Sequence, residues 1–94
     1  MHALVVRVTI HNVDRTREVL NSQVVPLLSG APGFKTGYWT WATEGGVTNG
    51  LSMIIFDSTE NATAAGDRLS GIATGYPEDV TIAGVEVREV VASA

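Results

Sequence analysis

The sequence contains no cysteine, and it has few basic residues and no long apolar segment. The absence of cysteine excludes disulfides, thiolate metal ligands and a cysteine nucleophile. Six unclustered basic residues face ten acidic ones, so the formal charge of −4 would repel a phosphate backbone and we expect no nucleic-acid partner. The apolar N-terminal segment is interrupted at Arg7, too early for a signal sequence or a membrane span, which predicts a cytoplasmic protein.

The remaining composition is that of a compact, ordered domain. Of the 94 residues, 45 % are hydrophobic and 17 % are charged, whereas disordered chains carry fewer aliphatic residues and more charge. We therefore expect a single domain over residues 1–94. A chain of this length buries only about 60 % of the surface that its unfolded form exposes, so an interface with another subunit would add stability.

Four segments rich in β-branched and aromatic residues predict the strands of one sheet. They run from Leu4 to Ile10, from Phe34 to Ala42, from Leu51 to Phe56 and from Val85 to Val91. A strand with one solvated face alternates apolar and polar residues, but these segments are apolar on both faces. Both faces of the sheet therefore require a cover.

Two amphipathic helices are expected between the strands. The first ends at Gly30, and Pro26 within it predicts a kink or a looser turn between Val24 and Leu28, because proline removes a backbone donor and clashes with the preceding turn. The second lies between residues 57 and 75, and its small side chains predict a close approach to the sheet.

The order strand, helix, strand, strand, helix, strand predicts an α+β domain with a ferredoxin-like βαββαβ arrangement. Two right-handed crossovers joined by a hairpin give a four-stranded antiparallel sheet in the order 4-1-3-2, with both helices on one face. The open face would exceed the apolar patch that is typical of monomers. We therefore expect the protein to dimerise through its open sheet face.

Six residues are candidates for a ligand pocket on this open face. They lie on alternate positions of the first, second and last strands, and are Arg7, Thr9, His11, Trp39, Trp41 and Arg88. None of them stands in a motif that identifies a catalytic residue.

Arg7 and His11 also have structural interpretations. A lone cation among valines is costly, so we expect Arg7 to pair with Glu86 or Glu89 on the last strand, and we favour this over anion binding. His11 either acts as an acid or base at the mouth of a cavity or is a solvent-exposed residue at the end of a strand, which we favour. No second histidine or acid accompanies it at ligand spacing, so no metal site is predicted.

Trp39 and Trp41 lie two positions apart, so both rings project from the same face of a strand. They are expected to anchor a dimer interface or to form the wall of an aromatic-binding cavity. The two interpretations are compatible, because the interior of a barrel is both interface and pocket.

The chain resembles the dimeric α+β barrel superfamily, close to the small antibiotic-biosynthesis-monooxygenase-like and stress-responsive domains. The resemblance covers almost the whole chain. It rests on Ala3-Leu4-Val5-Val6-Arg7-Val8, on Val24-Val25-Pro26-Leu27-Leu28, on Ala31-Pro32-Gly33-Phe34 leading into Gly37-Tyr38-Trp39, and on Ile54-Ile55-Phe56-Asp57-Ser58.

This resemblance implies two sheets packed face to face around a small cavity, but it leaves the activity open. Members of the superfamily range from cofactor-independent oxygenases to haem-degrading enzymes, isomerases and proteins with no known activity, and a fold alone cannot choose among them. The haem-degrading branch has an axial histidine on the second helix, whereas residues 58–75 contain none. We therefore expect no haem and no other cofactor.

Two functions remain as hypotheses. The first is a homodimeric barrel that holds a small apolar or aromatic molecule between its sheets and, if it is an enzyme, acts as a cofactor-independent monooxygenase. The second is a non-catalytic dimer, a binding or stress-linked protein whose sheet face is filled by its own side chains.

Overall fold

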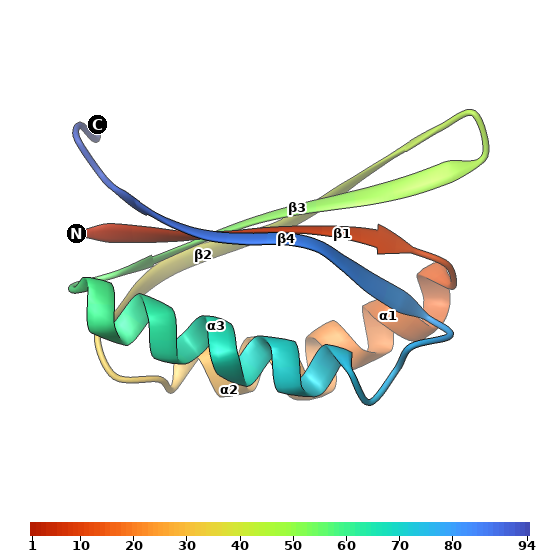
Figure 1. Cartoon of the computed structure of the whole chain (residues 1–94), viewed down its shortest axis with the longest axis horizontal. Helices are drawn as coiled ribbons and strands as arrows, with labels where there is room; N and C mark the ends of the chain where they lie inside the picture. Colours follow the sequence, from red (N-terminus) through yellow and green to blue (C-terminus); the bar gives the residue numbers. More distant parts are fainter.

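The computed structural model describes residues 1–94 as one antiparallel sheet with helices packed on a single face (Figure 1). The elements are β1 (His2–Ile10), α1 (Val13–Val19), η1 (Leu20–Val24), α2 (Val25–Ser29), β2 (Phe34–Glu44), β3 (Val47–Phe56), α3 (Thr59–Ala73) and β4 (Val80–Glu89). The strands lie in the order β2-β3-β1-β4, which is the predicted order read from the opposite edge. The predicted ferredoxin-like α+β fold is therefore confirmed. None of the helices combines the length and apolar character needed to cross a membrane.

The hydrophobic core lies between the sheet and the helices. The first helical segment comprises α1, η1 and α2. The core is formed by Leu4 and Val6 of β1, Ile54 and Phe56 of β3, Val19, Val24 and Leu28 of the first helical segment, and Ala62, Ala65 and Leu69 of α3. The helix α3 approaches the sheet closely because it presents small residues there: a Cβ atom added to Gly66 would lie 3.1 Å from Leu4 Cδ1.

The first helical segment widens into a π-helix, η1, between α1 and α2. The Val25 N–H donates its hydrogen bond to the carbonyl of Leu20, five residues earlier. The ring of Pro26 would clash with the Ser22 carbonyl in a continuous α-helix, and it is accommodated instead in the first turn of α2. A looser turn is therefore present, but its predicted position is wrong: it covers Leu20–Val24, whereas most of the predicted segment from Val24 to Leu28 lies in α2.

A β-bulge at the start of β2 changes which side chains face the helices. Phe34 pairs with Phe56 and Thr36 pairs with Ile55, so Lys35 is an extra residue. One extra residue moves every later side chain of the strand to the opposite face. The prediction that Trp39 and Trp41 share the open face with Arg7 is therefore wrong: both tryptophans lie on the helix-covered face.

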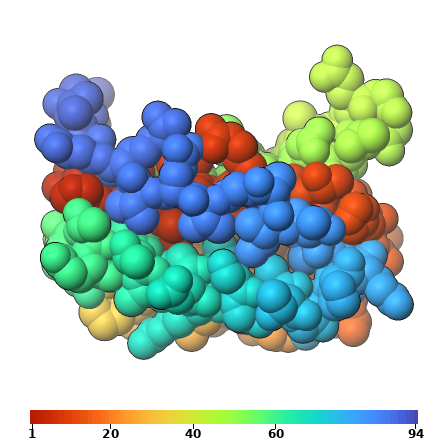
Figure 2. Space-filling model, viewed as in Figure 1, coloured from red at the N-terminus to blue at the C-terminus, as the bar shows by residue number.

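The open face of the sheet carries exposed apolar side chains. Leu51 and Met53 of β3 are 46 % and 47 % exposed, and Tyr38 of β2 is 68 % exposed. The β2–β3 hairpin and the C-terminal segment both rise above this face, at its opposite ends (Figures 1 and 2). The open face therefore lies between two segments that project beyond it.

An ion-pair network crosses the same face between β1 and β4. Arg7 Nη1 donates to Glu86 Oε1 at 2.6 Å, and Arg88 Nη2 donates to the same oxygen at 3.0 Å. The expected pairing of Arg7 with an acid of the last strand is confirmed, with Glu86 as the partner. The hydrogen bond from Arg7, followed by that from Arg88, holds the pKa of Glu86 below its ordinary value of 4.5.

This network predicts a loss of stability in acid that depends on Glu86. Because the pKa of Glu86 is lower in the folded protein than in the unfolded chain, its contribution is complete above pH 4.5 and disappears as the pH falls through the lowered pKa. Between about pH 6 and about pH 3, the melting temperature of the native protein should therefore fall more steeply than that of a Glu86→Gln variant, measured by circular dichroism. Parallel pH profiles would contradict this role.

Candidate functional site

A small apolar cavity lies between the sheet and the helices. Its volume is about 60 Å³, and 14 of its 19 lining residues are hydrophobic, so it favours an apolar occupant. Its walls include Val6, Val8 and Ile10 of β1, Val19, Leu20 and Val24 of the first helical segment, Trp39 and Trp41 of β2, and Leu69 and Ile72 of α3. On the sheet side the backbone of Gly50 lies directly against Val8, because a Cβ atom at Gly50 would come within 2.6 Å of Val8 Cγ2.

The cavity is bordered by a larger outer hollow between η1 and β2. The two spaces share four lining residues, which are Leu20, Trp39, Thr40 and Trp41. The outer hollow has a volume of about 450 Å³ and is also lined by Arg17, Asn21 and Val25. A ligand could therefore enter past the tryptophans. The π-helix η1 forms part of this entrance, and such widened turns are frequent at functional sites.

The indole N–H of Trp39 is a buried donor with no hydrogen-bond partner. Other polar groups of the lining are engaged within the protein: the Thr40 hydroxyl donates to the Leu51 carbonyl at 2.6 Å, and the Thr16 hydroxyl donates to the Asp79 carbonyl at 3.3 Å. An unpaired buried donor costs free energy, typically about 1–3 kcal/mol, unless a ligand or a water molecule accepts its hydrogen bond. Trp39 thus carries an unpaired donor and lines both the cavity and the outer hollow.

A guanidinium group stacks on the other tryptophan at the entrance. Arg17 of α1 lies with its central carbon 4.9 Å from the ring centroid of Trp41. The ion pairs of the structure involve Arg7, Arg15 and Arg88, but not Arg17. The entrance therefore carries a positive charge that no carboxylate of the protein neutralises by direct contact.

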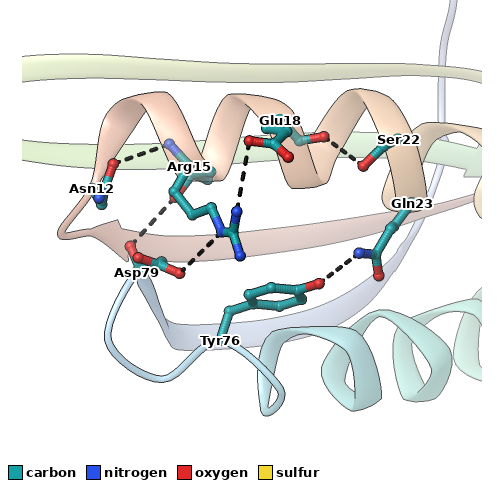
Figure 3. A network of polar contacts seen from close by, with 8 residues as sticks. Asn12, Arg15, Glu18, Ser22, Gln23, Tyr76 and Asp79 are labelled. Carbon is teal, nitrogen blue, oxygen red and sulfur yellow. Dashed lines mark hydrogen bonds and ion pairs between the residues drawn. The ribbon is translucent and has the colours of Figure 1, made fainter.

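A polar network closes the end of the cavity near Tyr76 and Asp79, which both belong to its lining (Figure 3). Gln23 Nε2 donates to the Tyr76 hydroxyl, and the Arg15 guanidinium lies over the Tyr76 ring, 5.8 Å from its centroid. Arg15 also forms ion pairs with Asp79 at 3.9 Å and with Glu18 at 3.7 Å. These contacts join the segment after α3 to the first helical segment and fix this end of the cavity.

The six candidate residues do not form one site. Arg7, Thr9 and Arg88 lie on the open face, and His11 follows β1, where its Nε2 is 2.8 Å from the Thr81 hydroxyl oxygen. The other two candidates, the tryptophans of β2, line the cavity beneath the helices. The structure contains no group of three or more His, Asp or Glu side chains that could hold a metal ion.

Sequence reasoning missed Arg17 as a residue of the entrance. Its helical spacing relative to Val13 and Leu20 indicated only that it faces away from the core. It becomes part of the site because the bulge at Lys35 turns Trp41 toward α1. No local pattern in the sequence reports that contact.

The architecture defines the class of protein as a ferredoxin-like α+β protein, and solved structures confirm it. SnoaB, a cofactor-independent oxygenase from Streptomyces nogalater, matches with a TM-score of 0.73 and 13% identity over 98% of this chain and 94% of its own. A dimeric ferredoxin-like protein from an uncultured marine organism matches with a TM-score of 0.69 and 10% identity over 100% of this chain and 98% of its own.

A designed protein has the same fold. The de novo designed protein Foldit4 matches with a TM-score of 0.74 and 11% identity over 95% of this chain and 97% of its own. An oxygenase and a designed protein are thus similarly close in structure, so the fold does not select the function. No protein-family model matches the chain, and no curated protein matches it in sequence.

Proposed function

We propose that the protein is a homodimeric α+β barrel in which each protomer binds a small apolar or aromatic molecule. The cavity beside Trp39 and Trp41 carries the proposal, because it is lined mainly by hydrophobic side chains and adjoins an outer hollow of about 450 Å³. Its volume of about 60 Å³ admits a short aliphatic group or the edge of a ring whose remainder lies in the outer hollow. We therefore propose a ligand site under the helices, in place of the site between two sheets that the sequence suggested.

The dimeric state is supported by the open face. Leu51, Met53 and Tyr38 expose apolar surface on neighbouring strands, and a second copy of this face would remove it from water. Such a contact is isologous, because the same face is used by both protomers. The similarity to a protein described as dimeric and ferredoxin-like supports a dimeric state.

Cofactor-independent monooxygenation is the reaction that we propose for this site. An electron-rich phenol bound in the apolar cavity would supply all four electrons that reduce O₂. Its O–H bond and one ring C–H bond break, one oxygen atom forms the new carbonyl of a quinone, and the other leaves as water with the two hydrogens. The similarity to SnoaB, which is described as a cofactor-independent oxygenase, supports testing this reaction first.

A non-catalytic binding protein is the second candidate, and one observation favours it. Asp79, the carboxylate in the cavity lining, is 3.9 Å from the Arg15 guanidinium, and its charge is directed to that partner. It is therefore already engaged within the protein, and the cavity lining contains no other carboxylate and no histidine that could accept a proton from a substrate.

Tryptophan fluorescence tests the binding proposal directly. Trp39 and Trp41 are the two tryptophans of the chain, and both line the cavity, so emission reports on this site. We expect naphthalene and toluene to change the emission in a saturable way, after the emission of each ligand alone has been subtracted. A variant that fills the cavity, Ala73→Leu, should weaken binding by about tenfold or more, because Ala73 lines it.

Ala64→Leu is the matched control, because Ala64 lies on the exposed side of the same helix and the substitution is identical. Its binding curve should equal that of the native protein. A flat emission signal with every ring-bearing ligand would reject the cavity as a binding site. The product formed from 1-naphthol under isotopically labelled O₂ would then separate the two candidates. A quinone that carries one labelled oxygen atom, in excess of a protein-free blank, identifies a monooxygenase, and binding without labelled product identifies a binding protein.

A further inference from the structure

Two polar groups beside the apolar cavity are left without partners by the protein itself. The first is the stacked guanidinium of Arg17 at the entrance, and the second is the buried indole N–H of Trp39. They belong to residues that line the same outer hollow. One ligand could therefore engage both groups while its apolar part occupies the cavity.

The position of the guanidinium over the Trp41 ring leaves it available to an anion. A cation–π contact engages none of the N–H donors in a hydrogen bond, so the fork that matches the two oxygens of a carboxylate stays free. Stacking on Trp41 also restrains Arg17, so less side-chain entropy is lost when an anion binds.

The surrounding charges do not cancel this cation. Apart from Arg17, the residues that line the outer hollow are neutral, namely Leu20, Asn21, Val25, Trp39, Thr40 and Trp41. The nearby acid on α1, Glu18, contacts Arg15 at 3.7 Å. The chain as a whole has a formal charge of −4 and repels anions, so attraction of an anion here depends on Arg17.

We propose that the natural ligand is a small carboxylic acid with an apolar or aromatic body. Its carboxylate pairs with Arg17 at the entrance, its body enters the cavity between Trp39 and the helices, and one of its oxygen atoms accepts the hydrogen bond of Trp39 Nε1. This proposal rests on the binding function proposed above and specifies the chemical class of the ligand. Arg17 acts as a residue that determines specificity, and no covalent step is involved.

Paired ligands of the same shape test the role of Arg17. Phenylacetate and phenylacetamide differ mainly in charge, and we expect the native protein to bind the acid about tenfold more tightly than the amide. Arg17→Gln should abolish that preference, whereas Arg17→Lys should retain part of it, because lysine supplies a charge without the planar fork. Added salt should reduce the preference in the native protein.

The matched control is Arg68→Gln, which removes an exposed arginine of α3 that does not line the cavity. It changes the net charge by the same amount and should leave the preference for phenylacetate unchanged. An equal loss of preference in both variants would mean that only overall charge matters, and it would overturn the assignment of Arg17.

Trp39→Phe tests the second contact, because it keeps an aromatic ring and removes the N–H group. Both ligands lose contact with the larger ring, but naphthalene has no acceptor oxygen, so we expect phenylacetate to be weakened about fivefold more than naphthalene. The remaining tryptophan, Trp41, still reports binding. Equal effects on both ligands would show that the ring packs against ligands without donating to them, which contradicts the proposed hydrogen bond.

These outcomes separate the two proposals. If naphthalene binds but phenylacetate and phenylacetamide bind equally, the ligand is not an acid and only the further inference fails. If no ring-bearing ligand binds, charged or neutral, both the binding function and the inference are rejected. Preference for the acid that persists in Arg17→Gln also overturns the inference, because the anion would then bind elsewhere.

Discussion

A Leu51→Arg variant is expected to be monomeric at concentrations at which the native protein is a dimer. Leu51 lies on the central strand β3, directly opposite Arg7 of β1, and is 46 % exposed on the open face. In the proposed dimer the new guanidinium would be buried next to an existing cation, and an uncompensated buried charge costs about 3–5 kcal/mol. Because the interface is isologous the change occurs twice, so the dissociation constant should rise by at least about a hundredfold.

Sedimentation velocity over a range of protein concentrations measures this change. Ala64→Arg provides the control, since it places the same cation on the exposed side of α3, away from the open sheet face. That variant should remain dimeric. A dimer that survives Leu51→Arg would mean that the protomers associate through another surface, and a native protein that stays monomeric at every concentration would reject the proposed dimer.

Gly33→Ala is expected to destabilise the protein by about 3 kcal/mol, from backbone strain and overpacking together. Gly33 has a φ of +78°, in the left-handed region that residues with a Cβ atom adopt at a cost. A Cβ atom there would overlap Asp57 Oδ1 and lie 2.6 Å from Asn61 Nδ2. It would thus disrupt the hydrogen bond between these two side chains, and strain the one from the Asp57 N–H to the Gly33 carbonyl.

Gly45→Ala separates the two contributions, because Gly45 has a φ of +58° but no atom lies within 4 Å of an added Cβ. This variant should lose only about 1 kcal/mol, from backbone strain alone. Urea denaturation gives both values. Similar losses in the two variants would show that the contact between the turn and the start of α3 contributes little to stability.

The fold was largely predictable because its signals are local. The elements can be recognised from strands that are apolar on both faces, from the turn after Gly30 and from two helical segments. The rules for connecting such elements then leave few possible topologies. The start of β4 was the main error, because the strand begins at Val80 and not at Val85. A register shift between its partners Arg7 and Val8 interrupts the alternation there, which made the first half of the strand hard to recognise.

The candidate site was only partly predictable. The two tryptophans of β2 were correctly paired on one face of their strand, and the pairing of Arg7 with an acid of the last strand was correct. The face chosen for Trp39 and Trp41 was wrong. Phe34 does pack against the core, but the extra residue at Lys35 breaks the regular alternation between Phe34 and the tryptophans.

The sequence by itself determined the four strands, the helices and their order, because hydrophobic periodicity, proline and glycine act on the backbone within a few residues. Only the tertiary structure decided which face the tryptophans occupy and that Arg17 lies over Trp41. The physical reason is that a bulge costs little where it occurs, yet it reverses every side chain that follows, and its presence depends on pairing with a neighbouring strand. The cavity and its free donors therefore result from the packing of β2 against β3 and the first helical segment.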